Sequence, residues 1–166
     1  MRDLIPAQPF IALAAGGIDP NRTYHRWPEF LDLLERCDTP GMPKEIVVLG
    51  SDNGLEIAQQ LCATPRRDLR ISSQVGKLSF LQTRALVEQS SLFVGADGGL
   101  MHVAHTTPTP SVSLFSHREP PYLRLTDACR SIGLQAEGNV DTIAPSQVMD
   151  AVLQQLLHTG MRDVTA

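Results

Sequence analysis

Residues 92–105 read LFVGADGGLMHVAH, an apolar run that turns through Gly-Ala-Asp-Gly-Gly into a helix-like segment. Gly95, Gly98 and Gly99 permit positive φ angles and let a ligand approach the backbone closely. The start of the helix offers unpaired N–H groups and the positive end of the helix dipole, which suit a diphosphate. The stretch therefore predicts a strand, a tight turn and a helix, with a phosphate site at the turn. A plain strand-to-helix turn with Asp97 as the N-cap is the alternative interpretation.

The alternation of apolar runs and helix-like segments extends from this stretch in both directions. Strands are expected at residues 10–14, 45–49, 70–73, 92–95 and 110–115, and helices at residues 28–36, 53–63, 79–90, 99–106 and 146–158. Ser79 is expected to cap its helix, and Asp52 or Asn53 the helix at 53–63. Gly160 is expected to end the last helix. Because the strands are continuous apolar runs, the pattern predicts an α/β fold, a parallel sheet of five or six strands between two helical layers.

The carboxyl ends of parallel strands predict where a ligand binds, since open α/β sheets bind ligands beyond that edge. We expect the turn at residues 95–100 to lie there beside the loop at Gly16 and Gly17. The chain has 166 residues, enough for one domain, and its net charge of -4 argues against a nucleic-acid partner. Residues 1–9 are expected to be a linker, residues 10–160 the domain and residues 161–166 a tail.

Other features of the sequence narrow the class of protein further. No apolar run reaches the roughly 20 residues that span a bilayer, and a cytoplasmic protein is expected. The cysteines Cys37, Cys62 and Cys129 are far apart, which favours free thiols over a disulfide framework or zinc knuckle. His102 and His105 have no third ligand nearby, so no metal site is expected. A phospho-receiver and a dinucleotide oxidoreductase are rejected, because the first strand precedes neither clustered carboxylates nor G-x-G-x-x-G.

Four landmarks resemble the bacterial heptosyltransferase family of glycosyltransferases. GADGGLMHVAHTTPTPSVSLFS, residues 95–116, is similar to the family's G-N-D-S-G-L-M-H pattern and the strand that follows it. Residues 75–99 resemble its G-K-T-S-L stretch, residues 26–30 (RWPEF) its K-R-W-P helix entry, and residues 47–58 (VVLGSDNGLEIA) its V-x-L-G-G segment. The landmarks occur in the family's order and cover nearly the whole chain.

The resemblance implies one half of a two-domain, Rossmann-like, GT-B type enzyme that transfers sugar with inversion. This half would bind a nucleotide-diphosphate sugar, of the ADP-heptose kind, as substrate, with no tightly bound cofactor or metal. The partner would be the missing N-terminal acceptor-binding domain, which supplies the catalytic base, so no catalytic residue is expected in this chain. Membrane contact would be peripheral, through the acceptor lipid at the inner face of the inner membrane. The implied donor and phosphate residues are Asp97, Gly98, Gly99, Leu100, His102, Gly17, His25 and Arg26, and the implied nucleoside residues are Asp52 and Glu56.

Three positions depart from the family pattern. Gly98 stands where the family has a hydroxyl residue, His25 where it has lysine, and Ser116 where it has glycine. These departures suit a variant donor, and they equally suit a non-catalytic nucleotide-binding or interaction module derived from such an enzyme. The sequence leaves both functions open.

Overall fold

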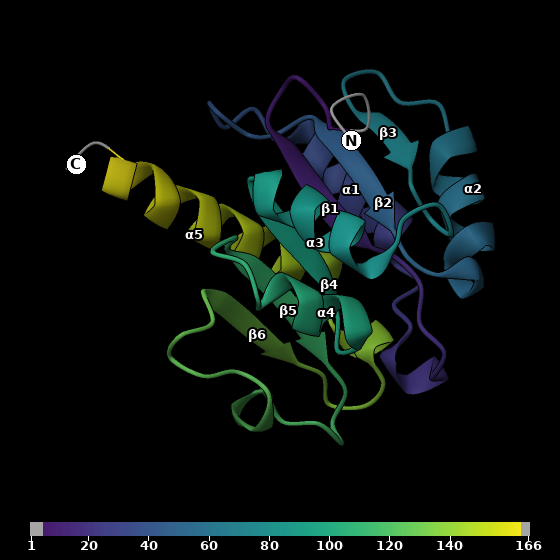
Figure 1. The fold of residues 1–166 in the computed structure, drawn as a ribbon, viewed down its shortest axis with the longest axis vertical. Helices are drawn as coiled ribbons and strands as arrows, with labels where there is room; N and C mark the ends of the chain where they lie inside the picture. The colour runs from purple at the N-terminus through teal and green to yellow at the C-terminus, as the bar shows by residue number, and fades with distance from the viewer. Residues whose placement is uncertain (1–4, 164–166) are drawn as a thin grey trace.

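A computed structural model describes residues 5–163 of the chain, with side chains described as far as residue 157. Its centre is one sheet of six strands in the order β3-β2-β1-β4-β5-β6, with every neighbouring pair parallel (Figure 1). The strands are β1 (Phe10–Ala14), β2 (Glu45–Leu49), β3 (Arg70–Ser73), β4 (Leu92–Ala96), β5 (Ser111–Phe115) and β6 (Ser131–Gln135). The predicted parallel sheet is confirmed.

Helices cover both faces of the sheet, as the continuous apolar strands predict. They are α1 (Trp27–Arg36), α2 (Leu55–Ala63), α3 (Phe80–Gln89), α4 (Gly99–Ala104) and α5 (Pro145–Asp163). Alternate side chains of one strand enter opposite halves of the core. Ile11 and Leu13 of β1 pack in the half that contains α1 and α5, whereas Phe10 and Ala12 pack in the half that contains α3 and α4.

The ends of the helices show which of the predicted caps and stop signals are correct. Ser79 caps α3 in a capping box, because its Oγ accepts from the Gln82 backbone N–H and its own N–H donates to Gln82. The other two predictions are wrong. Residues 52–54 form a separate 3-10 turn, η3, so α2 begins after Gly54 without a side-chain cap. Helix α5 continues past Gly160, because one glycine lowers helix propensity without breaking the helix.

Strand β6 was not predicted. Its sequence, SIGLQ, has no continuous apolar run, and its residues are half-buried or exposed because it lies at an edge of the sheet. Among the described residues, no α-helix lies between β5 and β6 in the chain to cover this edge. Instead the connection from β5 to β6 runs through an irregular loop with one 3-10 turn, η4 (Pro121–Leu123).

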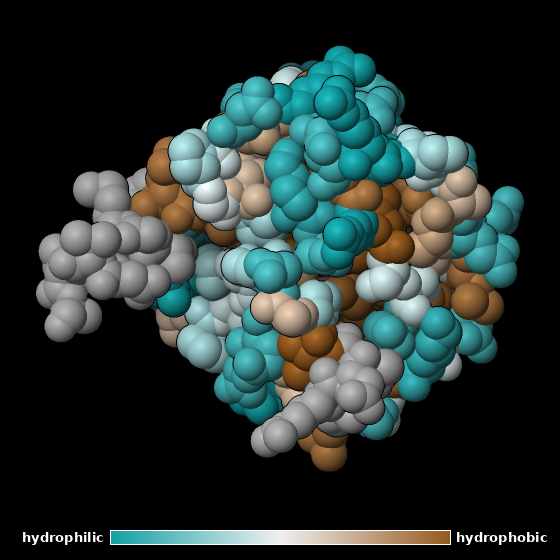
Figure 2. All heavy atoms as spheres, turned by 90° about the horizontal axis from the view of Figure 1, so that it is seen from above, coloured by the Kyte–Doolittle hydropathy of each residue, from teal (hydrophilic) through white to brown (hydrophobic). Residues whose placement is uncertain are grey.

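The apolar core is buried between the layers of the fold. Figure 2 shows the molecule from above, where hydrophilic side chains cover much of the surface and leave separate apolar areas between them. Within residues 5–163, no helix is both long and apolar enough to cross a bilayer.

Candidate functional site

A cleft opens at the carboxyl edge of the sheet, where β1 and β4 lie side by side. The chain leaves β1 toward α1 on one face and leaves β4 toward α4 on the other. Such a point, where the strand order reverses, leaves a crevice in which doubly wound folds bind ligands. Here the crevice has a volume of about 630 Å³. The predicted neighbourhood is confirmed, because Gly16 and Gly17 line it together with residues 97–100.

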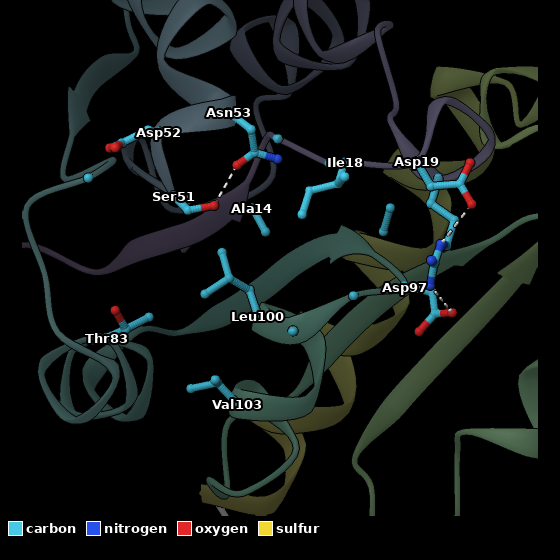
Figure 3. A pocket seen from close by; sticks show the side chains of 18 of the residues that line it. Ala14, Ile18, Asp19, Ser51, Asp52, Asn53, Thr83, Asp97, Leu100 and Val103 are labelled. Atoms are coloured by element: carbon cyan, nitrogen blue, oxygen red, sulfur yellow. Dashed lines mark hydrogen bonds and ion pairs between the residues drawn. The ribbon is translucent and has the colours of Figure 1, made fainter.

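The two ends of the cleft differ in chemistry. Figure 3 shows Ser51, Asp52 and Asn53 at one end and Asp19 and Asp97 at the other. The first end follows β2, and its Ser51 hydroxyl donates to the Asn53 side chain over 2.5 Å. Apolar Leu78 and Phe80, at the start of α3, also line the cleft. Both ends carry carboxylates, and the basic side chain of Arg22 lies at the second end, beside Asp19 and Asp97.

The glycines in the cleft, and Gly95 next to it, divide into two groups by what surrounds them. A Cβ added at Gly95 would lie 2.7 Å from the Ala14 Cβ, and one at Gly16 would lie 2.7 Å from the Gly54 Cα. These two glycines are needed for close packing between strands and loops. At Gly98 the nearest atom would be 3.9 Å away, and at Gly99 nothing would lie within 4 Å.

The motif glycines do not use the positive φ angles that glycine permits. Among the described residues, only Gly41 and Gly76 have positive φ in the left-handed region, and Gly98 has an extended φ of 168°. Neither backbone conformation nor packing therefore requires glycine at Gly98 or Gly99. Because these two residues have no side chains, the space beside them along the cleft is open.

Asp97 ends the turn after β4 with its side chain only 1% exposed. The N-cap of α4 is Gly98, and no side chain caps this helix, so the alternative interpretation of Asp97 as an N-cap is wrong. The Asp97 carboxylate lies 3.6 Å from Arg22 Nη1, 3.9 Å from Arg124 Nε and 4.0 Å from His102 Nε2. Its Oδ2 has no hydrogen-bond partner among the described residues. A buried carboxylate thus gathers three basic groups without hydrogen bonding to them.

Helix α4 is shorter than predicted. It has six residues and ends at Ala104, whereas the sequence indicated a helix to residue 106. Its first N–H groups, at Gly99 and Leu100, still have no partner within the helix. The dipole of so short a helix is small, so any anion bound here needs charged side chains as well.

Arg22 reaches the cleft because of a local turn. The Asp19 carboxylate accepts from the Asn21 backbone N–H at 2.8 Å, and Pro20 begins the 3-10 turn η2 (Pro20–Arg22). This turn places Arg22 Nε 3.4 Å from Asp19. The hydrogen bond from Asn21 lowers the pKa of Asp19, and the charge of Arg22 lowers it further. The Asp-Pro-Asn sequence signals the turn, but sequence analysis assigned Arg22 no role.

Four of the residues that the resemblance implies lie outside the cleft lining: His25, Arg26 and His102 of the donor set and Glu56 of the nucleoside set. His25 is bound to Asp141, whose carboxylate accepts from the His25 backbone N–H at 2.7 Å and contacts its Nδ1 at 2.8 Å. Arg26 donates twice to Glu29, at 2.9 and 2.7 Å, and this pairing raises the pKa of Arg26. Glu56 is exposed on α2, whereas Asp52 lines the cleft.

The two histidines of α4 have different surroundings. The His102 side chain is 57% exposed and lies beside Asp97, outside the cleft lining. Burial lowers the pKa of His105, and the charge of His102 lowers it further. The His105 ring contacts the Ser111 hydroxyl at 3.4 Å. In the described part of the chain, no group of three metal-ligating side chains could hold a metal ion.

Comparison with known proteins assigns the chain to a family. The family model for glycosyltransferase family 9 (heptosyltransferase) matches residues 6–148. The chain belongs to glycosyltransferase family 9. Lipopolysaccharide heptosyltransferase 3 of Escherichia coli is 38% identical over 60 residues, which are 36% of this chain and 16% of that protein.

Two solved structures of family 9 glycosyltransferases have the same fold. A glycosyl transferase family 9 protein from Veillonella parvula superimposes with a TM-score of 0.77 and 19% identity, over 95% of this chain and 49% of that chain. The ADP-heptose lps heptosyltransferase II of E. coli gives 0.74 and 22%, over 92% and 48%. These neighbours are GT-B glycosyltransferases, so the predicted fold class is confirmed. The chain spans about half the length of each.

Proposed function

We propose that this chain is the donor-binding half of an inverting glycosyltransferase and that its cleft takes a nucleotide-diphosphate sugar of the ADP-heptose kind. The open space beside Gly98 and Gly99 is the observation that carries the proposal. Two consecutive glycines that neither φ nor packing requires leave the backbone N–H groups accessible to a ligand. Membership of family 9 supplies the class of ligand.

The nucleotide would lie along the cleft with each part in a suitable environment. Apolar Leu78 and Phe80 would contact the base, and the Asp52 carboxylate would accept from ribose hydroxyls. The diphosphate would cross the loops at residues 16–17 and 98–100. The sugar would then lie next to Asp97, near His102.

A second unit would have to complete the enzyme. The apolar side chains of Ile18 and Phe80 line the cleft, yet they are 91% and 64% exposed. Exposed apolar groups around a cleft mark an interaction surface. We assign that surface to an acceptor-binding domain that supplies the catalytic base, so this chain alone would bind donor without transferring sugar. Contact with a membrane would then be peripheral, through a lipid acceptor at the inner face of the inner membrane.

The alternative function is a non-catalytic nucleotide-binding or interaction module. The observation in its favour is that His25, which replaces the family lysine, is engaged by Asp141 away from the cleft. Gly98 also lacks the hydroxyl that the family pattern places beside the phosphates. A module would tolerate both changes, whereas a donor site must compensate for them.

Titration calorimetry with ADP, AMP and ADP-heptose on the 166-residue chain tests the proposal. We expect ADP and ADP-heptose to bind more tightly than AMP, because the second phosphate adds charge beside the basic groups. A transfer assay with this chain alone should give no product above background. If ADP binds no better than AMP, or none of the three binds, the donor site is wrong and the interaction module becomes the better account.

A further inference from the structure

We infer that Arg22 and Arg124 form a clamp for the terminal phosphate of the donor nucleotide, and that Asp97 is the positioning residue that holds both guanidinium groups. The inference rests on the proposed function, because the clamp acts on the donor's diphosphate. Arg22 comes from the connection between β1 and α1, and Arg124 from the connection between β5 and β6. Asp97, after β4, lies between them in the fold.

The burial of Asp97 is the first argument. Its side chain is 1% exposed and its Oδ2 has no hydrogen-bond partner among the described residues. Leaving a buried carboxylate oxygen unpaired is unfavourable, so such an atom in a folded protein calls for an explanation. The two guanidinium groups nearest to this same Oδ2, at 3.6 and 3.9 Å, give one.

The lengths of these contacts are the second argument. A separation of 3.6 Å or more is an ion pair but not a hydrogen bond, so neither contact uses a guanidinium N–H. The side chains of Arg22 and Arg124 are 34% and 42% exposed, which leaves them accessible to a ligand. A guanidinium presents donors in a planar fork that matches phosphate oxygens. Asp19 engages the Arg22 Nε at 3.4 Å, so the donors that remain for a ligand are the terminal Nη groups of Arg22 and the guanidinium of Arg124.

The charges of the cleft are the third argument. Of the described residues that line it, Asp19, Asp52 and Asp97 are acidic and Arg22 is basic. A diphosphate in direct contact with the Asp97 carboxylate would be repelled. Arg22 lines the cleft and Arg124 lies outside its lining, and both are within 4 Å of Asp97. A phosphate at this end of the cleft would therefore meet positive charge, and Asp97 acts through the arginines. The two arginines also supply the positive charge that the family's lysine would supply, since the residue at that position, His25, is bound to Asp141 away from the cleft.

Calorimetry with ADP and AMP, in buffer containing EDTA, tests the clamp on single variants of the full chain. Arg22→Gln and Arg124→Gln should each weaken ADP binding by about tenfold or more and change AMP binding by no more than about twofold. Arg118→Gln is the matched control. Arg118 is exposed in the same loop as Arg124, and its substitution removes the same charge. Arg22→Lys keeps the charge but not the fork, so it should restore part of the ADP affinity and also serves if the glutamine variant fails to fold.

Asp97→Asn separates a positioning residue from a direct ligand. Without its charge the arginines lose their anchor, so the preference for ADP over AMP should fall while AMP binding stays the same. Tighter ADP binding in Asp97→Asn would overturn the positioning role. If the wild-type chain prefers ADP and both glutamine variants retain that preference, the clamp is wrong while the donor site stands. ADP binding that requires Mg²⁺ would also overturn the clamp, and a wild-type chain that does not prefer ADP would instead overturn the proposed function.

Discussion

Gly95, at the end of β4, is enclosed by the neighbouring strand, whereas Gly99, four residues later, faces the open cleft. Both belong to one strand-turn-helix motif, and the sequence gives no reason to separate them. The structure separates them by the space that a Cβ would occupy. Gly95 allows β1 and β4 to pack closely, and Gly99 leaves room for a ligand. One motif therefore contains glycines for folding and glycines for binding, and substitutions should affect one property at a time.

The largest effect is expected at the packed glycine. Gly95→Val should lower the free energy of unfolding by about 2–3 kcal/mol, because its Cβ would lie 2.7 Å from the Ala14 Cβ and 3.0 Å from the Phe93 ring. Urea unfolding followed by circular dichroism measures the change. Wild-type stability in this variant would show that the strands tolerate a side chain there, and the distinction between the two glycines would be lost.

The next effect is expected at the open glycine, on binding alone. Gly99→Val should weaken ADP binding by about tenfold or more, because the branched side chain fills the space through which the phosphates approach the backbone. Its unfolding free energy should stay within about 1 kcal/mol of wild type, since nothing lies within 4 Å of the new Cβ. Gly99→Ala, which adds one carbon, is the matched control. ADP binding by Gly99→Val that equals wild type would refute the ligand role of this glycine.

The smallest effect is a predicted gain. Gly98→Ser restores the hydroxyl of the family pattern at a position where the nearest atom to the new Cβ is 3.9 Å away. One additional hydrogen bond to phosphate should tighten ADP binding by about two- to tenfold. Gly98→Ala, which adds the carbon without the hydroxyl, is the comparison in the same titration. Weaker binding by the serine variant than by the alanine variant would show that the phosphates do not pass this position.

Much of the fold could be predicted because the sheet is buried. The buried strands at residues 10–14 and 45–49 have the predicted bounds, and so does the half-exposed edge strand at residues 70–73. Continuous apolar or β-branched runs identify strands that are covered on both faces. Strand β6 could not be found in this way, since none of its residues is fully buried and its sequence has no continuous apolar run. Helix α5 extends farther than predicted, because Gly160 was expected to end the helix and lies within it instead.

The site was less predictable than the fold, for a geometric reason. The glycines and Asp97 are contiguous in sequence, so the motif revealed them. Arg22 and Arg124 are 102 positions apart, and only the packing of two loops around Asp97 brings them together. His25 was assigned to the site by its place in the motif, but Asp141, 116 positions away, holds it elsewhere.

A comparison of the cleft with a cavity at the opposite edge of the sheet offers the most direct test of the central claim. That cavity, of about 700 Å³, lies at the amino edge of the sheet and is lined by residues such as Met42, Thr109 and Leu156. An NMR titration of the ¹⁵N-labelled chain with ADP distinguishes the two. We predict that the largest shifts occur in the amide signals of residues 16–17 and 98–100, while those around Met42 and Thr109 stay unchanged. Shifts gathered at the amino edge, or no shifts at residues 98–100 at saturating ADP, would contradict the assignment of the glycine-lined cleft as the donor site.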